Sequence, residues 1–351
     1  MSIVKLLSII SLLIFSSCAV TSSQSSSPFE TEKVKINKCH IKRAALDIGS
    51  GTSKLVVAVI NKCNETVHNI LFEAHRAIPF KEHLQRNKSG KFSKAFITDS
   101  INKLAELRSM AYRQGAHKIR AVATSAFRTA KNAKESASRI SKALGFPIKI
   151  ITQTDEALIA FHAALAKARS LEIPMANKIA VWDIGGGSMQ IIKRSSDNEK
   201  AIYLGKLASV TFKNRVIKEI NKSKSNSPNP LGQKRAISAM TMARKYANKS
   251  ARPIIDTLRG YQVFGVGGVH YYSVKNQINI HSNFFGRSNI LDTLLLRSNY
   301  NDQKLDSRYA NTEVTNLALV LGFMQSLSID KIYPLKINMA HGVLTDESMW
   351  K

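Results

Sequence analysis

The stretch Val181-Trp-Asp-Ile-Gly-Gly-Gly-Ser-Met-Gln-Ile-Ile192 joins two apolar runs through an acid, three glycines and a hydroxyl. Apolar runs of this length predict two strands, and the glycines permit a tight turn with its backbone N–H groups exposed at the tip. Such a turn can bind phosphate, because the amides and the hydroxyl face the anion while Asp183 holds a magnesium ion through water. A hairpin without any ligand explains the same residues equally well.

The same pattern occurs a second time, 136 residues earlier. The stretch Ala44-Ala-Leu-Asp-Ile-Gly-Ser-Gly-Thr-Ser-Lys-Leu-Val-Val-Ala58 again joins an apolar run to a second one through an acid, Asp47, and a turn of glycines and hydroxyls. This spacing is that of a domain rather than of a short repeat. We therefore expect two similar halves with a cleft between them.

A third glycine turn, Val263-Phe-Gly-Val-Gly-Gly-Val-His270, also follows an apolar run, as a loop that packs on a phosphate chain would. The candidate phosphate-binding residues of the three turns are Gly49, Ser50, Gly51, Thr52, Gly185, Gly186, Gly187, Ser188, Gly265, Gly267 and Gly268. The candidate metal ligands, for Mg²⁺, are Asp47 and Asp183.

The chain of 351 residues is 44% hydrophobic, which is enough for two domains, and it is strongly basic. Its 52 Lys and Arg against 24 Asp and Glu give a net charge of +28. This charge favours polyanionic partners such as polyphosphate, nucleic acid or anionic lipid, although a generally basic proteome would produce the same composition. Between Lys206 and Arg252 there are twelve Lys or Arg and a single acid, Glu219, which predicts a basic face beside the cleft.

Residues 1–17 carry one cation, an apolar segment and small residues before Cys18. This pattern predicts a secretory signal that is too short to span a bilayer. Its end resembles a bacterial lipoprotein box, so Cys18 is expected to be lipidated and, with Ala19 after it, to anchor the protein in the outer membrane facing the periplasm. An ordinary or uncleaved signal is the alternative. The Ser-rich segment within residues 18–40 is then a tether.

Two further cysteines, Cys39 and Cys63, each lie 12 residues from Gly51 in the first turn. In an antiparallel hairpin they face one another near its open end, within reach of a disulfide, which export would permit. Two buried free thiols are the alternative.

The remaining pattern predicts α/β structure. The expected elements are a strand pair over residues 69–80, a helix capped by Thr98-Asp99-Ser100, a helix that ends at Gly145, and a helix capped by Thr154-Asp155-Glu156.

Taken together, these motifs resemble the Ppx/GppA phosphatases of the actin, sugar-kinase and heat-shock-chaperone ATPase superfamily. The segment Ala123-Thr-Ser-Ala-Phe-Arg-Thr-Ala-Lys-Asn132 is similar to the family's Ala-Thr-Ser-Ala-Leu-Arg word, and Leu204-Gly205 is similar to the start of its Leu-Gly-x-Val turn. The resemblance covers about residues 42–346 and implies two RNase H-like (actin-like ATPase) domains facing a central cleft. These are domain I at 41–155 and domain II at 156–351, with the C-terminal segment packing back on domain I.

The resemblance also implies roles for single residues. Glu156 matches the family's catalytic base, Arg128 matches its substrate-phosphate arginine, and Gln190 stands where the family has a second catalytic acid. The implied activity is the release of terminal phosphate from inorganic polyphosphate or a nucleoside polyphosphate with Mg²⁺. Nucleic acid is a less favoured partner, and a homodimer is compatible with the sequence, which does not decide the oligomeric state.

The chain also departs from the family pattern at several places. Gln190 cannot accept a proton, Gly51 replaces Asn, Val269 replaces Thr, and His341 replaces an acid. These changes leave the phosphate-binding residues in place. They raise the alternative of a catalytically attenuated lipoprotein that binds polyphosphate or another polyanion. A small-molecule kinase is a weaker alternative, because ATP is scarce outside the cytoplasm.

Overall fold

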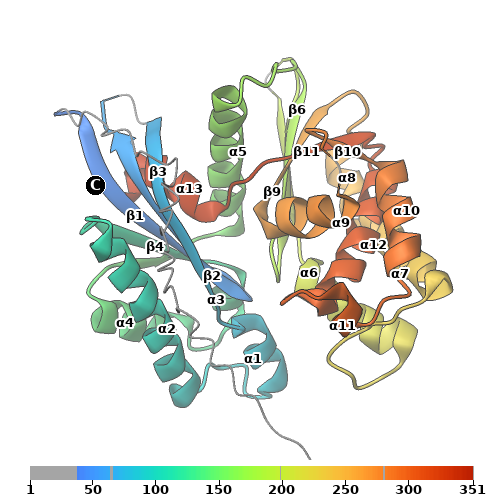
Figure 1. Cartoon of the computed structure of the whole chain (residues 1–351), viewed down its shortest axis with the longest axis horizontal. Coiled ribbons are helices and arrows are strands. Elements are labelled where there is room, and N and C mark those ends of the chain that lie inside the picture. Colours follow the sequence, from blue (N-terminus) through green and yellow to red (C-terminus); the bar gives the residue numbers. More distant parts are fainter. Residues whose placement is uncertain (1–37, 64–65, 198, 280, 351) are drawn as a thin grey trace, which may run out of the picture. The chain divides into compact units, whose positions relative to one another are not determined.

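Two β-sheets, each containing one of the predicted hairpins, organise the part of the chain that can be described (Figure 1). The structure is a computed structural model that describes residues 38–63, 66–197, 199–279 and 281–350. The signal segment, Cys18 and all but the end of the predicted tether lie outside the described residues. None of the helices in the described part is long and apolar enough to cross a membrane.

The first sheet has five strands in the order β3-β2-β1-β4-β5. Their bounds are β1 His40–Ile48, β2 Thr52–Asn61, β3 Thr66–Ala77, β4 Ile119–Ala123 and β5 Ile148–Ile150. Strands β1, β2 and β3 pair antiparallel, whereas β4 and β5 join parallel to β1.

The second sheet has six strands in the order β10-β11-β9-β6-β7-β8. Their bounds are β6 Ile179–Ile184, β7 Met189–Arg194, β8 Lys200–Gly205, β9 Gln262–Val266, β10 Phe285–Gly286 and β11 Lys331–Pro334. Here too an antiparallel meander, β6-β7-β8, is followed by parallel strands, β9 and β11. The repeated strand topology confirms the predicted α/β fold with two similar sheets. The domain boundary at residue 155 stays a prediction.

Helices connect the strands and cover the sheets. In the first part of the chain they are α1 Phe80–Arg86, α2 Lys94–Arg113, α3 Ser125–Thr129, α4 Ala133–Leu144 and α5 Gln153–Ser170. In the second part they are α6 Ser209–Val216, α7 Gln233–Ser250, α8 Arg252–Ile255, α9 Asn276–Ile278, α10 Arg287–Arg297, α11 Asp302–Leu305, α12 Ala310–Ser326 and α13 Met339–Thr345. Two π-helical turns, Ile217–Asn221 and Val269–Lys275, and a 3₁₀ turn, Glu347–Met349, complete the chain.

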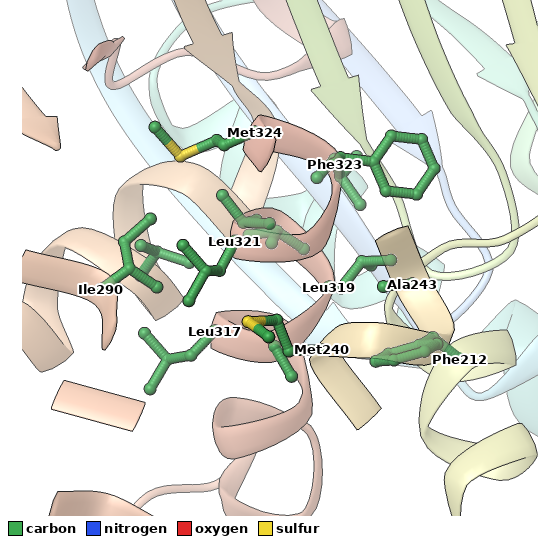
Figure 2. Close-up of a cluster of buried hydrophobic side chains, with 14 of the residues drawn as sticks. Phe212, Met240, Ala243, Ile290, Leu317, Leu319, Leu321, Phe323 and Met324 are labelled. Carbon is green, nitrogen blue, oxygen red and sulfur yellow. The ribbon is translucent and has the colours of Figure 1, made fainter. Parts of the chain in front are cut away.

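Helix α12 is the centre of the second core (Figure 2). It is buried along almost its whole length: residues 317–324 are apolar on every side, whereas the first half also buries polar side chains such as Glu313 and Asn316. A side chain at Gly322 would lie 2.6 Å from the carbonyl oxygen of Met240, so glycine is what allows α12 to approach α7 this closely. Leu317 and Leu321 extend from α12 on the side of Ile290, whereas Phe323 points to the other side, where its ring centroid lies 5.5 Å from that of Trp182 on β6.

Three predicted local features are wrong. Helix α2 begins four residues before Thr98, because the Ser93 side chain accepts a hydrogen bond from the Phe96 amide and is the actual cap. Helix α5 is capped by Thr152, which forms a capping box with Asp155. Residues 69–80 are not a strand pair, since β3 pairs with β2 from Thr66 to Ala77 and α1 follows at once.

The open end of the first hairpin carries a disulfide between Cys39 and Cys63, whose Cα atoms are 5.4 Å apart. Neighbouring residues His40 and Asn61 are register partners of β1 and β2. The pairing therefore agrees with the hairpin register expected from the equal spacing of the two cysteines around Gly51.

The last helix of the chain packs against the first sheet. Helix α13 contacts β1, β2 and α5, and Arg43 of β1 forms an ion pair of 2.6 Å with Glu347 just beyond it. Arg120 of β4 donates to the carbonyl oxygen of Met349 at 2.9 Å. The end of the chain thus belongs to the core of the first sheet.

Candidate active site

The tips of the two hairpins lie against each other. A side chain at Gly187 would lie 2.9 Å from Oγ of Ser50 in the first turn and 2.7 Å from Oγ of Ser125 at the start of α3. At Gly186 a side chain would lie 3.2 Å from Cβ of Ser50. Only glycine fits this approach, so the second turn presents backbone and hydroxyls, with no side-chain bulk, toward the first.

Three carboxylates surround the two turns: Asp47 at the end of β1, Asp183 near the end of β6 and Glu156 in the first turn of α5. The pKa of Glu156 is raised to about 7, mainly by burial; Arg128 opposes this rise and Asp47 adds to it. Burial raises the pKa of Asp183 to about 8, with Glu156 and Asp47 contributing. Burial also raises the pKa of Asp47. These mutual effects mean that a cation or a proton stabilises the group.

Arg128 joins the predicted base to the second turn. Its Nη1 lies 2.7 Å from Oε2 of Glu156, and its Nη2 donates to Oγ of Ser188 at 3.1 Å. Nη1 also donates to the carbonyl oxygen of Ile151 at 3.2 Å, which fixes the orientation of the guanidinium. The structure therefore brings together the three residues that the sequence predicted separately.

Gln190 lies inside this site, opposite Asp183 in the register of β6 and β7. Its side chain is buried, and its Nε2 donates to Oγ of Ser188 at 3.4 Å. Oε1 of Gln190 has no hydrogen-bond partner among the described residues. This amide oxygen is available to a water or a ligand hydroxyl but cannot take a proton at neutral pH.

The third glycine turn supports the site in two ways. Gly267 has a positive φ of 82°, and a side chain there would lie 2.5 Å from Oδ1 of Asp183, so this glycine fits directly beneath the carboxylate. Gly265 serves packing instead, because a side chain would collide with the ring of His270 at 2.6 Å. Gly268 has open space around it. Thr52 in the first turn shares a hydrogen bond of 3.2 Å with the hydroxyl of Tyr309.

The donor set around Asp47 and Asp183 suits a magnesium ion. Oδ1 of Asp47 is buried and has no hydrogen-bond partner in the described part of the chain. No three His, Cys, Asp or Glu side chains among the described residues form a metal cage by themselves. Mg²⁺ usually takes one or two carboxylates and completes its coordination with water and substrate oxygens, so the absence of a larger cluster within the described ranges is compatible with the predicted role of Asp47 and Asp183, which stays a prediction.

One cation of the site, Lys54, was not among the residues predicted from the sequence. Nζ of Lys54 lies 3.8 Å from Oδ2 of Asp47; the two residues are register partners across the first turn, a relationship that hairpin symmetry would have predicted. His341, which replaces an acid of the family pattern, lies on α13, where its Nε2 is 3.0 Å from Oε1 of Glu73 on β3. This contact lowers the pKa of Glu73.

Comparisons with known proteins place the chain in one family. Exopolyphosphatase 1 of Mycobacterium tuberculosis is 30% identical over 158 residues, which are 42% of this chain and 44% of that protein. The guanosine-5'-triphosphate,3'-diphosphate pyrophosphatase of Vibrio cholerae is 27% identical over 193 residues, which are 54% of this chain and 36% of that protein. The chain thus spans less than half the length of these relatives.

Solved structures share the fold at low identity. The Ppx/GppA family member of Aquifex aeolicus matches with a TM-score of 0.68 and 18% identity, over 89% of this chain and 98% of that one. An exopolyphosphatase from Cytophaga hutchinsonii matches with a TM-score of 0.67 and 17% identity, over 87% of this chain and 96% of that one. Residues 58–252, more than half of the chain, match the Ppx/GppA phosphatase family. Since this segment includes Arg128, Glu156 and the whole second hairpin, the chain belongs to the Ppx/GppA phosphatase family.

Proposed function

We propose that this protein releases terminal phosphate from inorganic polyphosphate or from a nucleoside polyphosphate by attack of water, with Glu156 as the base. The observation that carries the proposal is the position of Glu156: its carboxylate is buried, held by Arg128 at 2.7 Å, and connected through Arg128 to Ser188 of the second glycine turn. A base placed next to a phosphate-binding turn is what hydrolysis of a phosphoric anhydride requires.

The protonation properties of Glu156 suit this role. A general base works best when its pKa lies close to the working pH, and burial raises the pKa of Glu156 to about 7. In the proposed reaction Glu156 takes a proton from water, the water oxygen bonds to the terminal phosphorus, and the bond from phosphorus to the bridging oxygen breaks. Arg128 and the amides of the glycine turns would stabilise the charge on the phosphoryl oxygens.

Asp47 and Asp183 would hold Mg²⁺ at this site. The ion would neutralise phosphoryl oxygens of the substrate, and its positive charge would offset the mutual repulsion of the three carboxylates. Lys54, next to Asp47, carries a positive charge on the same side of the site.

We also propose that the protein works outside the cytoplasm, anchored to the outer membrane through lipidated Cys18. The lipoprotein-like box in the sequence supports the anchor, and the disulfide between Cys39 and Cys63 supports an oxidising compartment. The relatives named exopolyphosphatase and guanosine polyphosphate pyrophosphatase support a polyphosphate or nucleoside polyphosphate as the substrate. Export makes the inorganic polymer the better candidate.

A second candidate function is favoured by Gln190. Because this buried amide occupies the place of the family's second catalytic acid, the protein would bind polyphosphate and turn it over slowly, or only bind it. Replacing Gln190 by Glu separates the two functions: a gain in phosphate release with Mg²⁺ would mean that the natural protein is catalytically attenuated.

The decisive experiment measures phosphate release from long-chain polyphosphate and from nucleoside triphosphates, with and without Mg²⁺. Glu156→Gln should lower turnover by roughly two to four orders of magnitude with affinity nearly unchanged, because a general base acts on water and not on the bound anion. Asp183→Asn should lower both the turnover and the affinity for polyphosphate, because a ligand of the proposed Mg²⁺ would be lost. Glu135→Gln, an exposed position on α4, is the matched control. If wild type binds polyphosphate tightly but releases no phosphate with Mg²⁺ present, the hydrolase proposal is wrong and the binding function remains.

A further inference from the structure

Lys81, the second residue of α1, lies against the first and second glycine turns and against α3. Its backbone amide donates to the carbonyl oxygen of Ser50 in the first turn at 2.8 Å. Its Nζ donates to Oγ1 of Thr129 in α3 at 3.4 Å. A side chain at Gly187 in the second turn would lie 3.4 Å from Cδ of Lys81. The backbone of Lys81 thus contacts the first turn, and its side chain lies against the second turn and the helix that carries Arg128.

Among the described residues, no carboxylate lies within 4.0 Å of Nζ of Lys81, so its charge has no acidic partner there. Glu82, the acid in α1, forms an ion pair of 3.0 Å with Lys213 of α6 and so is not the partner of Lys81. Burial lowers the pKa of Lys81, and the nearby Arg128 lowers it further. Two cations in a partly buried space repel each other, and a bound anion would relieve that repulsion.

Hydroxyl groups complete the same space. Oγ of Ser50 is buried and has no hydrogen-bond partner in the described part of the chain. It lies, with Oγ of Ser125, within 3 Å of the position that a side chain at Gly187 would occupy. This hydroxyl faces the second turn, which Lys81 and Arg128 also contact. A buried hydroxyl without a partner beside such a turn indicates an anion site rather than a packed core.

Contacts between α1 and the second half of the chain hold Lys81 in this position. Lys213, whose side chain is buried, reaches Glu82 from α6, and Asn214 donates to Gln85. Arg86 at the end of α1 donates to Asn226 at 3.2 Å. At the start of α6, backbone N–H groups donate hydrogen bonds to the carbonyl oxygens of Gly185 and Gly186. The helix that carries Lys81 is therefore fixed beside the second turn.

We propose that Lys81 is a second phosphate-binding cation of the active site, which acts with Arg128 on one phosphoryl group. Two positive charges on one group select a terminal phosphate with two negative charges over a phosphodiester with one. The site would therefore accept chain ends and reject nucleic-acid backbones. This inference rests on the proposed function, because it assigns a role in binding the same substrate.

The test is a calorimetric titration with sodium tripolyphosphate, which needs no turnover if Mg²⁺ is left out. Lys81→Met should raise the Kd roughly 10- to 100-fold, the range expected for a lost hydrogen bond to a charged group. Lys81→Arg should restore most of the affinity. Lys88→Met, an exposed lysine just after α1, should leave the Kd within about twofold of wild type. Thermal melting of each variant verifies that it is folded, and Lys81→Gln replaces the methionine variant if that one is not.

The outcomes separate this inference from the proposed function. If wild type binds tripolyphosphate and Lys81→Met binds it equally well, Lys81 is a structural residue and the inference is wrong, while the hydrolase proposal stands. If wild type neither binds nor hydrolyses tripolyphosphate, the proposed function itself fails and the inference fails with it. Selectivity adds a second readout, since Lys81→Met should narrow the preference for orthophosphate over dimethyl phosphate as a competitor.

Discussion

Arg128 and Glu156 form a partly buried ion pair of 2.7 Å between α3 and α5, and the same guanidinium reaches Ser188 in the second glycine turn. Planar guanidinium groups hold two partners at once in a fixed geometry. The position of the base therefore depends on the position of the turn. A phosphoryl group that binds to Arg128 competes with Glu156 for the guanidinium, which would free the carboxylate to act on water.

Replacing Arg128 by Lys should show whether catalysis needs only the positive charge at this position or also the two simultaneous contacts of the guanidinium. Lysine keeps the positive charge but cannot hold Glu156 and Ser188 together, so we expect turnover of tripolyphosphate to fall roughly 10- to 100-fold. Steady-state kinetics with Mg²⁺ measures this change. Arg113→Lys, at the exposed end of α2, is the control. Unchanged turnover in Arg128→Lys would show that the charge alone is sufficient.

Gly187→Ala should damage the site without unfolding the protein. The added methyl group would lie 2.7 Å from Oγ of Ser125 and 2.9 Å from Oγ of Ser50, so the turns must separate. We expect weaker binding of tripolyphosphate, measured by calorimetry. Gly51→Ala is a matched control in the facing turn, because a side chain there meets no atom within 4 Å. Equal effects of the two substitutions would contradict the close contact of the turns.

The disulfide should stabilise the fold by an amount that grows with the logarithm of the length of the loop that it closes. Cys39 and Cys63 are 24 residues apart, and a loop of this size corresponds to about 3.5 kcal/mol of unfolding free energy. Urea denaturation of the double variant Cys39→Ser/Cys63→Ser should show this loss. Reduction should destabilise the wild type by a similar amount and leave the variant unchanged. A reductant effect on the variant would point to another cause.

His270 should make the protein less stable at acidic pH. Its ring is fully buried against Trp182, with ring centroids 4.9 Å apart, and neither nitrogen has a hydrogen-bond partner among the described residues. Burial lowers the pKa of His270 to about 3, from 6.5. Between these two pKa values the unfolded chain therefore binds one more proton than the folded protein. The contribution of His270 to the free energy of unfolding is fully present above pH 6.5 and is lost as the pH decreases.

The test of His270 compares wild type with His270→Leu. Urea denaturation between pH 7 and pH 4.5 measures how the free energy of unfolding depends on pH. Below pH 6 this free energy should fall more steeply in wild type than in His270→Leu, by about 1.4 kcal/mol per pH unit, because one proton is involved. Other titrating groups cancel in this difference. Parallel pH curves for the two proteins would mean that the His270 ring finds a partner for its proton.

The basic segment from Lys206 to Arg252 should act on long substrates only. Arg215, Lys245 and Lys249 line a groove of about 590 Å³ with Tyr246 between α6 and α7, whereas Lys213 is occupied by Glu82. We expect the affinity for long-chain polyphosphate to fall steeply with salt, and that for tripolyphosphate to fall less. Lys245→Gln/Lys249→Gln should reduce the slope for the polymer alone. Equal slopes for both substrates would place the segment away from the substrate path.

Local sequence patterns were sufficient for the two hairpins, because two apolar runs and a glycine turn are specified by neighbouring residues. Helix α4 likewise ends at Gly145, whose positive φ of 72° suits glycine. The starts of α2 and α5 were wrong because several residues with capping side chains stand close together, and only the folded backbone decides which one accepts the bond. Ser93 and Thr152 are the actual caps, because their extended backbone conformation lets the side chain accept a hydrogen bond from the first turn of the helix.

The site residues divide in the same way. Asp47, Asp183 and the glycines lie within recognisable motifs, whereas Lys81 reaches the site only because α1 is held against α6 by contacts such as Lys213 with Glu82. These partners are 131 residues apart, and neither belongs to a pattern that would indicate the other. Residues that enter a site through tertiary contacts of this kind carry no local signal.

The docking of α13 on the first sheet has a consequence for how the protein is made. Ala45 and Val56, on the first two strands, share a core cluster with Val343 and Leu344 of α13, and Arg43 completes its ion pair only with Glu347. During synthesis, this face of the first sheet therefore stays uncovered until α13 and Glu347 have left the ribosome. The nascent protein should remain sensitive to proteases up to that length, and a ribosome-bound series of increasing length would show protection appearing only once residues 339–347 have emerged.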